Sequence, residues 1–391
     1  MQQYPYQFPI EQYYNPSRFE MIKNCFSMEE TPFLVIDLEK VKTRYLQLRQ
    51  LMPYADIYYA VKSNPDDEVL KLLRDLGCYF DIATIYEMDQ LLRLNVDPAS
   101  MSFGNTIKKA EHIRYAYNQG VRLFATDSEE DLDKLSKFAP QSRVFFRIMN
   151  DGTGADWPLS RKFGAHPDLI YSLALKCVEL NLIPYGLSFH VGSQQRDIGQ
   201  WDDAIAQSNY LFEALSSQGV NLQMLNLGGG LPAHYLNPTL DIEIYSEEIT
   251  RYLQEDFGMQ FPRIIIEPGR FMTGDAGIIF TEIVMIAKKS KTNPYQWVYL
   301  DVGVFGGLIE TIEESIKYPV YFEGEGNSQE IILAGPTCDS MDVLYEKYKY
   351  RMPESAQSGD RVAIFSCGAY TQSYSAACFN GFPPLKSYTF R

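Results

Sequence analysis

The stretch IYYAVKSNPDDEVLKLLRDLGCYFDIA (57–83) holds one copy of the pattern that decides the fold. A short apolar run is followed by a segment in which Val and Leu recur at three- and four-residue steps, and then by a second apolar run. The spacing is typical of an amphipathic helix, and continuous apolar runs are typical of parallel strands buried on both faces. The stretch therefore predicts a strand–helix–strand unit.

The same alternation recurs from about residue 33 to 270. The other apolar runs are FLVID (33–37), MSFGN (101–105), LFATD (123–127), VFFRIM (144–149), GLSFHVG (186–192), MLNLGGG (224–230) and IIIEPGR (264–270). About eight such units in roughly 240 residues favour a (β/α)8 barrel over an open sheet. Barrel active sites are built where strands end, and polar residues stand at these places: Lys62, Asp81, Asn105, Arg147, His190 and Glu267.

After about residue 271 the pattern changes. Runs such as IIFTEIVMIAKKS (278–290), QWVYLDVGVF (296–305) and RVAIFS (361–366) are rich in β-branched and aromatic residues and are separated by turn residues. They predict an all-β domain, a sandwich or barrel. The aromatic, Pro-rich N-terminal segment does not fit a barrel unit, and we expect it to join this domain. The predicted domains are a barrel at 30–270 and a β domain made of 1–29 and 271–391.

Composition excludes several classes of protein. The net charge of −15 disfavours nucleic acid as a partner, because phosphate binding requires clustered Lys and Arg. Six Cys without a CxxC pair, together with only four His, predict neither a zinc site nor a disulfide scaffold. The N-terminus lacks a basic and apolar leader, and no run reaches the ~20 apolar residues of a membrane span. We expect a cytoplasmic protein that binds no membrane and no metal.

Three strand ends carry residues suited to a cofactor with a carbonyl, a phosphate and a ring nitrogen. Lys62 ends an apolar strand, where partial desolvation favours the neutral amine that forms a Schiff base, although a strand-end lysine that reaches solvent looks the same. Gly228, Gly229 and Gly230 allow close backbone approach to a phosphate, or form a tight turn. Glu267 could hold a heterocyclic N–H⁺ and Arg270 a phosphate; the alternative is an ordinary salt bridge.

Further candidates are individually weaker. His190 in FHVGS could stack on an aromatic ring and Ser193 could bind phosphate, but a single His is more often a core residue. Cys338 in GPTCDSMD is a candidate proton donor or a small buried side chain, and Asp339 could bind an ammonium group. Tyr370 in CGAYTQSY could reach a phosphate, and FNGFPP, which begins at Phe379, could shape a pocket.

The order of these motifs (the lysine, then HVGS, GGG, EPGR, CD and GAY) resembles the fold-type III pyridoxal-phosphate decarboxylases. This alanine-racemase-like group contains the ornithine, lysine and diaminopimelate decarboxylases, and the resemblance runs from about residue 30 to the C-terminus. It implies a barrel followed by a β domain, pyridoxal 5'-phosphate as cofactor, and a head-to-tail homodimer whose two active sites lie at the interface.

The resemblance also implies residue roles. Lys62 matches the Schiff-base lysine, and Asp81, Arg147 and His190 match residues around the cofactor, with His190 stacked on its ring. The residues that match the phosphate shell are Ser193, Gly228 to Gly230, Arg270 and Tyr370. Glu267 matches the carboxylate on the pyridinium nitrogen. Cys338 matches the residue that protonates the carbanion, and it would come from the partner subunit together with Asp339, which would hold the distal amine.

The motif CDSMD favours an ornithine-type enzyme over a diaminopimelate-type one, which has Glu at the Asp339 position. Very long arginine decarboxylases of this fold do not match a chain of 391 residues. In ornithine decarboxylases of the eukaryotic kind, a second Asp also binds the distal ammonium, and Glu314 stands at about its position. The longer Glu side chain would change the depth of the substrate pocket. Ornithine, giving putrescine, is the first prediction. The alternatives are a lysine/ornithine bifunctional enzyme, a racemase on the same barrel, and a catalytically silent regulator.

Overall fold

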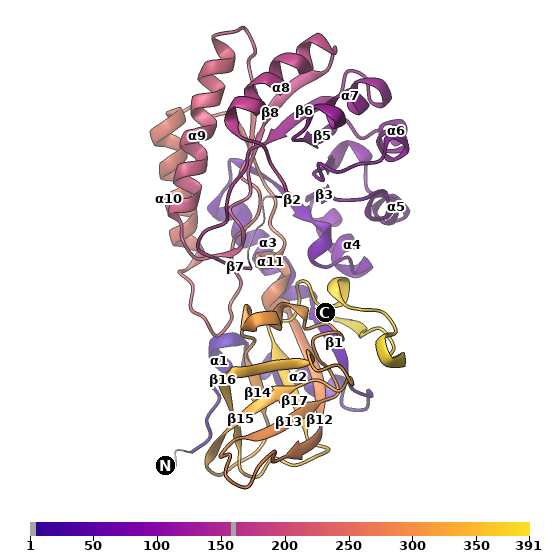
Figure 1. Ribbon diagram of the computed structural model, residues 1–391, viewed down its shortest axis with the longest axis vertical. Coiled ribbons are helices and arrows are strands. Elements are labelled where there is room, and N and C mark those ends of the chain that lie inside the picture. The colour runs from indigo at the N-terminus through magenta and orange to yellow at the C-terminus, as the bar shows by residue number, and fades with distance from the viewer. Residues whose placement is uncertain (1–4, 158–161) are drawn as a thin grey trace. The chain divides into compact units, whose positions relative to one another are not determined.

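The computed structural model describes residues 5–157 and 162–391, and these divide into two compact units (Figure 1). The barrel unit contains the described residues of Lys42–Pro232 together with Thr239–Phe271. The β unit contains the described residues up to Val41, the short segment Ala233–Pro238, and Met272–Arg391. The chain therefore passes between the two units several times.

Eight parallel strands close the barrel. In chain order they are β2 (Ala55–Ala60), β3 (Tyr79–Ile82), β4 (Met101–Phe103), β5 (Leu123–Thr126), β6 (Arg143–Arg147), β8 (Ile183–Ser188), β10 (Met224–Asn226) and β11 (Arg263–Ile266). The pairing of β11 with β2 closes the ring. Apolar side chains such as Tyr58, Phe145 and Met224 pack together in its core. The predicted (β/α)8 barrel is confirmed.

Helices connect successive barrel strands and lie outside them (Figure 1). They are α4 (Asp67–Asp75), α5 (Ile85–Arg93), α6 (Ala110–Gln119), α7 (Glu129–Phe138), α8 (Pro167–Glu179), α9 (Gly199–Ser216) and α10 (Ile242–Phe257); α3 (Leu38–Leu51) precedes β2. Local chemistry explains where they begin. Asp66, Thr84 and Ser128 each accept a backbone N–H of the first turn of α4, α5 and α7, as N-caps do.

The β unit is built on one curled, mixed eight-stranded sheet. Its strands are β1 (Phe33–Asp37), β12 (Gly277–Ala287), β13 (Gln296–Leu300), β14 (Val320–Phe322), β15 (Ser328–Ala334), β16 (Val343–Pro353), β17 (Arg361–Phe365) and β18 (Lys386–Phe390). The long strand β12 pairs with β1 and β17 through its first half and with β13 through its second. The predicted β domain is therefore present.

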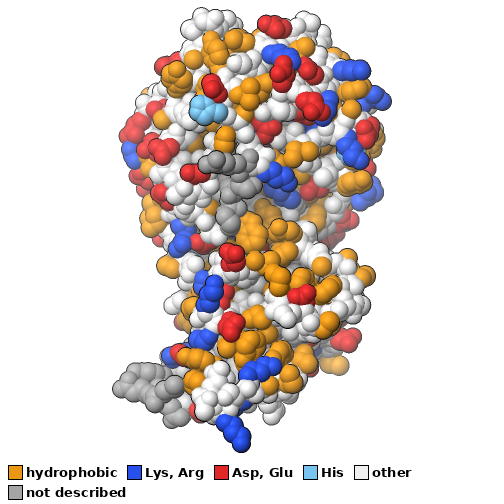
Figure 2. Space-filling model, in the orientation of Figure 1, with side chains coloured by type: hydrophobic (Ala, Val, Ile, Leu, Met, Phe, Trp, Pro, Cys, Tyr) orange, Lys and Arg blue, Asp and Glu red, His pale blue; other side chains and the backbone are white. Residues whose placement is uncertain are grey.

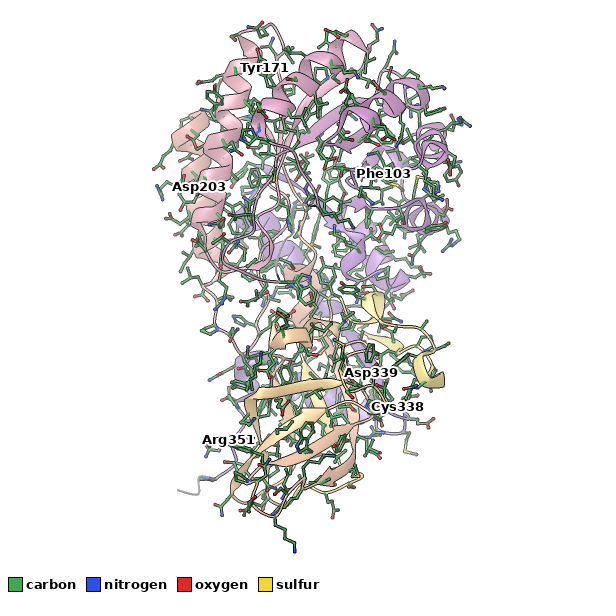
Figure 3. The ribbon with its side chains drawn as sticks, in the orientation of Figure 1. Phe103, Tyr171, Asp203, Cys338, Asp339 and Arg351 are labelled. Carbon is green, nitrogen blue, oxygen red and sulfur yellow. The ribbon has the colours of Figure 1, made fainter. Side chains whose placement is uncertain are left out.

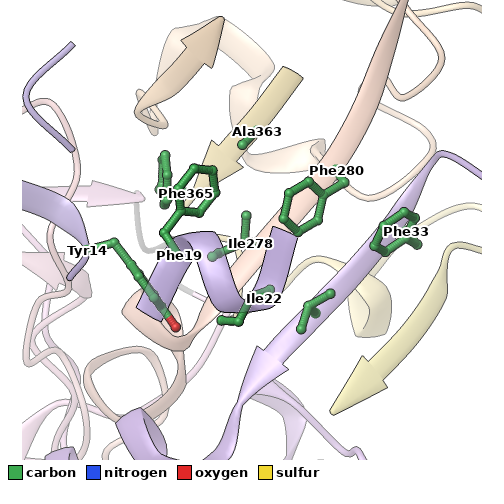
Figure 4. Packing of buried hydrophobic residues seen from close by; sticks show 9 residues of the cluster. Tyr14, Phe19, Ile22, Phe33, Ile278, Phe280, Ala363 and Phe365 are labelled. Carbon is green, nitrogen blue, oxygen red and sulfur yellow. The ribbon is translucent and has the colours of Figure 1, made fainter. Parts of the chain in front are cut away.

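The N-terminal segment packs on this sheet, as expected. Helices α1 (Ile10–Tyr13) and α2 (Pro16–Cys25) place Tyr14, Phe19 and Ile22 against Phe280 and Phe365 of the sheet, where all five side chains are buried (Figure 4). Aromatic rings make up much of this contact, and Phe19 and Phe365 lie 5.1 Å apart between ring centroids. Burial of aromatic surface on this scale anchors the segment to the β unit.

The run at 33–37, which the sequence pattern assigned to the barrel, belongs to the β unit instead. It forms β1, which pairs with β12 and β18 in the β unit. All five of its residues are buried, so that it reads as a continuous apolar strand followed by helix α3, just as a barrel unit does. Sequence pattern cannot separate these two settings, because both bury a strand on two faces.

The surface mixes charges of both signs, with acidic side chains distributed over the face shown in Figure 2 rather than gathered in one patch. Across residues 5–157 and 162–391, no helix is long and apolar enough to cross a membrane. The same residues contain no cluster of three or more His, Cys, Asp or Glu that could hold a metal ion.

Candidate active site

The predicted cofactor residues of the barrel unit meet at the carboxyl ends of its strands. Lys62 lies in the short 3-10 helix η1 (Val61–Ser63) directly after β2, and Asp81 lies in the neighbouring strand β3. The Lys62 Nζ and Asp81 Oδ2 atoms are 3.3 Å apart. The Asp81 side chain is 5% exposed and that of Lys62 is 49% exposed. The Lys62 amine is therefore accessible, while the carboxylate that pairs with it is buried.

Asp81 lacks one hydrogen bond. Its Oδ1 atom is buried and has no hydrogen-bond partner. Burial raises the pKa of Asp81, and the nearby Lys62 ammonium opposes this rise. A Cβ on Gly104 would lie 2.0 Å from Asp81 Oδ1, so only glycine at that position leaves room for the carboxylate.

Glu267 follows β11 and is held by a residue that sequence reasoning missed. Asn226, the last residue of β10, donates a hydrogen bond from Nδ2 to Glu267 Oε1 at 2.5 Å. Burial, reinforced by the negative charge of Asp81, raises the pKa of Glu267 to about 7. Burial disfavours the ionised form of this carboxyl group. A cationic N–H group bound beside it would stabilise the carboxylate and offset that cost.

His190 follows β8 and remains a neutral ring. Burial, with smaller effects from Arg147 and Lys62, lowers the pKa of His190 to about 3. Its Nδ1 atom accepts the backbone N–H of Gly229 at 3.2 Å. The ring orientation is therefore fixed by the glycine turn, which leaves an uncharged aromatic face at the strand ends.

The glycine turn needs its glycines. Gly228 and Gly230 have φ values of +66° and +105°, and a Cβ on Gly228 would lie 2.2 Å from the Phe189 carbonyl oxygen. The N–H of Gly228 donates to Asn226 Oδ1 at 2.9 Å, and that of Gly229 donates to His190. Two of the three amides predicted to cradle phosphate thus have partners within the chain, and a phosphate would share or replace these bonds.

Arg270 and Ser193 lie together beside this turn. Ser193 begins β9 (Ser193–Gln195), which pairs with β7 (Ala155–Trp157), and Arg270 begins the short helix α11 (Arg270–Thr273). Ser193 Oγ accepts hydrogen bonds from Arg270 Nε at 3.1 Å and from Nη2 at 3.0 Å. The guanidinium is buried, so the pair offers a positive charge and a hydroxyl suited to a phosphate dianion.

Arg147 ends β6 and stands over the ring of Phe163, with its guanidinium carbon 5.0 Å from the ring centroid. Burial lowers the pKa of Arg147, although Glu267, Asp127 and Asp81 oppose this effect. The guanidinium still carries its charge at any physiological pH. It therefore supplies a positive field to the two buried carboxylates, Asp81 and Glu267.

The remaining predicted residues belong to the β unit. Cys338 and Asp339 lie in the exposed loop between β15 and β16 (Figure 3). Asp339 Oδ1 accepts the backbone N–H of Met341 at 2.8 Å, which fixes the turn. Tyr370 follows β17 with a φ of +56°, and Phe379 begins the 3-10 turn η6 (Phe379–Gly381), where its ring packs on Phe305 at 4.8 Å.

Glu314 makes structural hydrogen bonds within the β unit, and its predicted contact with substrate stays a prediction. It ends the 3-10 segment η4 (Ile309–Glu314), and its carboxylate accepts three consecutive backbone N–H groups of β16: Glu346 at 2.8 Å, Lys347 at 2.5 Å and Tyr348 at 2.9 Å. These donors lie near irregularities in the pairing of β15 with β16. The carboxylate thus satisfies N–H groups that a bulged ladder leaves unpaired.

Comparison with known proteins places the chain in a family. Residues 38–274 match the family "Pyridoxal-dependent decarboxylase, pyridoxal binding domain". The lysine/ornithine decarboxylase of Selenomonas ruminantium is 35% identical over 367 residues, which cover 92% of this chain and 90% of that one. The ornithine decarboxylase of Schizosaccharomyces pombe is 33% identical, with 90% and 81% covered. The chain belongs to the pyridoxal-dependent basic amino-acid decarboxylases.

Solved structures agree with this assignment. The Selenomonas ruminantium lysine decarboxylase in complex with pyridoxal phosphate and cadaverine has a TM-score of 0.86 and 32% identity, covering 95% of this chain and 93% of that one. The Paramecium bursaria Chlorella virus arginine decarboxylase has a TM-score of 0.87 and 28% identity, covering 96% and 100%. This viral enzyme is close to the present chain in length, unlike the very long arginine decarboxylases that the sequence argument set aside.

The cofactor is pyridoxal 5'-phosphate, and the barrel residues fit it. Lys62 offers an accessible amine, Glu267 a buried carboxyl for the ring nitrogen, and Arg270 with Ser193 a cation and hydroxyl for the phosphate. The buried Asp81 Oδ1, which has no hydrogen-bond partner, can accept from a polar group of the cofactor. Lys62, Glu267 and Arg270 could be proposed from sequence because each follows a strand, whereas Asn226 and Gly104 act only through contacts that form on folding.

Proposed function

We propose that this enzyme decarboxylates L-ornithine to putrescine and CO2, and that L-lysine is a second, slower substrate. The observation that carries the proposal is the adjacency of Cys338 and Asp339 on one exposed turn. A short carboxylate beside a thiol suits a substrate that ends in a simple ammonium group. Two relatives named for ornithine, at 33–35% identity, support the choice.

Chemically, the bound cofactor supplies an electron sink for the pair left when CO2 departs. Lys62 would provide the amine that holds the cofactor. Glu267 would hold the protonated ring nitrogen, and Asn226 orients that carboxyl through its 2.5 Å hydrogen bond. Arg270 and Ser193 would bind the phosphate, and Asp339 would hold the distal ammonium. Cys338 passes its thiol proton to the α-carbon, and the thiolate then takes a proton from water.

We also propose that the active unit is a homodimer in which Cys338 and Asp339 serve the barrel of the partner. Both side chains are exposed in this chain, as expected of residues that complete a site elsewhere. We further propose a reducing, cytoplasmic setting, because all six cysteines are free thiols.

A panel of L-ornithine, L-lysine, L-arginine and meso-diaminopimelate tests the proposal. CO2 and the amine product are measured for each, with Lys62→Ala protein as the inactive control. We expect kcat/KM to be highest for ornithine and lower for lysine. A higher value for arginine or diaminopimelate would reject the substrate choice while keeping the enzyme class.

Two alternatives give different results in the same panel. A racemase would invert the amino acid without releasing CO2. A catalytically silent regulator would release none and invert nothing. The barrel contains Lys62, Glu267 and Arg270 together. This set suits cofactor binding, and a regulator that binds no cofactor would not require it. A yellow purified protein that loses its colour in Lys62→Ala would support the enzyme.

A further inference from the structure

The thiol of Cys338 has a partner far along the chain. Asn380 Oδ1 accepts the backbone N–H of Cys338 at 3.1 Å and faces its Sγ atom at 3.4 Å. The backbone N–H can only donate, so this contact requires the amide oxygen rather than the nitrogen and fixes the orientation of the Asn380 side chain. Sulfur therefore meets an acceptor and is held as an S–H donor.

The turn that carries Asn380 has an unusual backbone. Cys378, Asn380 and Gly381 have φ values of +59°, +51° and +82°, in the left-handed region. Asn tolerates this region better than most residues, and Gly adopts it freely. The turn is anchored to the β unit by the ring contact of Phe379 with Phe305 and by the Ala376 N–H, which donates to the Phe305 carbonyl at 3.0 Å.

The loop that carries Cys338 is fixed independently. Asp342 is buried, and its carboxylate accepts the Val304 N–H at 2.8 Å, the Thr337 N–H at 2.9 Å and the Thr337 hydroxyl at 2.7 Å. Both residues are exposed, but each lies on a segment that further hydrogen bonds or a ring contact hold to the β unit.

We propose that Asn380 is a positioning residue for the proton donor Cys338. The inference rests on the role of Cys338 in the proposed function. Oδ1 accepts from both the backbone N–H and the thiol of Cys338, so the contact fixes the rotamer of the side chain and the direction of its S–H bond.

Two substitutions separate the side chain from the backbone. Asn380→Gly removes the hydrogen-bond acceptor, and glycine adopts a left-handed φ without strain. Asn380→Asp keeps an acceptor oxygen, and aspartate also tolerates a left-handed φ. Asn181→Gly, at another left-handed Asn (φ +56°) in the barrel unit, controls for an Asn-to-Gly change as such. All are made in the full-length holoenzyme.

The first measurement is the rate at which iodoacetamide alkylates Cys338, followed by peptide mass spectrometry with exposed Cys25 as internal reference. Asn380→Gly removes the acceptor that holds Sγ, so we expect about three- to tenfold faster alkylation of Cys338 in this variant. Asn380→Asp and Asn181→Gly should react no faster than the unmodified chain, and Cys25 should be unaffected throughout.

The second measurement is the ratio of diamine to CO2. A proton delivered to the α-carbon gives one diamine for each CO2. If it is delivered to the cofactor instead, the amino group stays there, and water releases the carbon chain as an aldehyde. We expect a ratio near one for the unmodified chain and for Asn380→Asp, and a lower ratio for Asn380→Gly.

The proposal is overturned if Asn380→Gly matches the unmodified chain in alkylation, or if Asn380→Asp behaves like Asn380→Gly. These results are distinct from a failure of the proposed function. A protein that releases no CO2 from any basic amino acid would reject that function, and the alkylation rates would still decide whether Asn380 controls the thiol.

Discussion

The Asn226 side chain donates a 2.5 Å hydrogen bond to Glu267, and through its own Oδ1 it accepts the N–H of Gly228. One amide thus connects the carboxyl expected at the ring nitrogen with the glycine turn expected at the phosphate. The two ends of the candidate cofactor site are therefore connected by one residue. Glu267 is buried beside Asp81, and its proton has consequences that can be measured.

The pKa of Glu267 is raised from 4.5 to about 7 by burial. Between these values the folded chain holds a proton that the unfolded chain has lost. The stabilising contribution is therefore complete below pH 4.5 and is lost as the pH rises to about 7. We expect the free energy of unfolding of cofactor-free protein, relative to that of Glu267→Gln, to fall across this interval. Urea titrations at several pH values measure it.

The unfolding free energy of Glu267→Gln is subtracted from that of the unmodified chain because other groups also titrate between pH 4.5 and 7. Burial lowers the pKa of His190 to about 3, so His190 alone makes stability increase with pH up to its unfolded value. Subtracting the Glu267→Gln curve removes this contribution. A difference that stays flat from pH 4.5 to 7 would contradict the assignment.

Gly104 is predicted to protect the geometry of Asp81. A Cβ at this position would lie 2.0 Å from Asp81 Oδ1, so Gly104→Ala must displace the carboxylate that stands 3.3 Å from Lys62. We expect roughly ten- to a hundredfold lower kcat/KM, because small misplacements of reacting groups are costly. Gly199→Ala, which meets its nearest atom at 3.2 Å, is the control and should change activity by less than about twofold.

Glu314 and Asp339 should separate stability from substrate binding. Glu314→Ala leaves three backbone N–H groups of β16 without their acceptor, and we expect a loss of about 2 kcal/mol in unfolding free energy with KM almost unchanged. Asp339→Ala should raise KM for ornithine with little change in unfolding. If Glu314→Ala instead raises KM and leaves stability intact, Glu314 binds substrate as the sequence first indicated.

The barrel, and the position of most candidate cofactor residues at its strand ends, could be predicted because they repeat a local signal. Lys62, His190 and Glu267 each follow a short apolar run, and parallel strands bring their ends to one edge. The run at 33–37 shows the limit, since a strand buried in a sheet and one buried in a barrel have the same composition.

The residues that sequence missed act through contacts between distant segments. Asn226 reaches Glu267 across 41 positions, and Asn380 reaches Cys338 across 42. Neither residue carries a charge or a regular spacing that would distinguish it from other asparagines. The hydrogen bonds of Glu314 were also missed, because its partners lie on a strand more than thirty positions later.

The proposed sharing of Cys338 between subunits can be tested by mixing two proteins that each form little or no diamine, with diamine as the readout. Lys62→Ala and Cys338→Ala chains are allowed to exchange subunits, after which half of the dimers are hybrids. Each hybrid contains one site with both residues intact and one with neither, so about a quarter of full activity should return. If Lys62 and Cys338 served the same site within one chain, no hybrid would hold a complete site. Mixing Lys62→Ala with the double variant Lys62→Ala/Cys338→Ala gives the control, which should stay inactive because no chain supplies the amine.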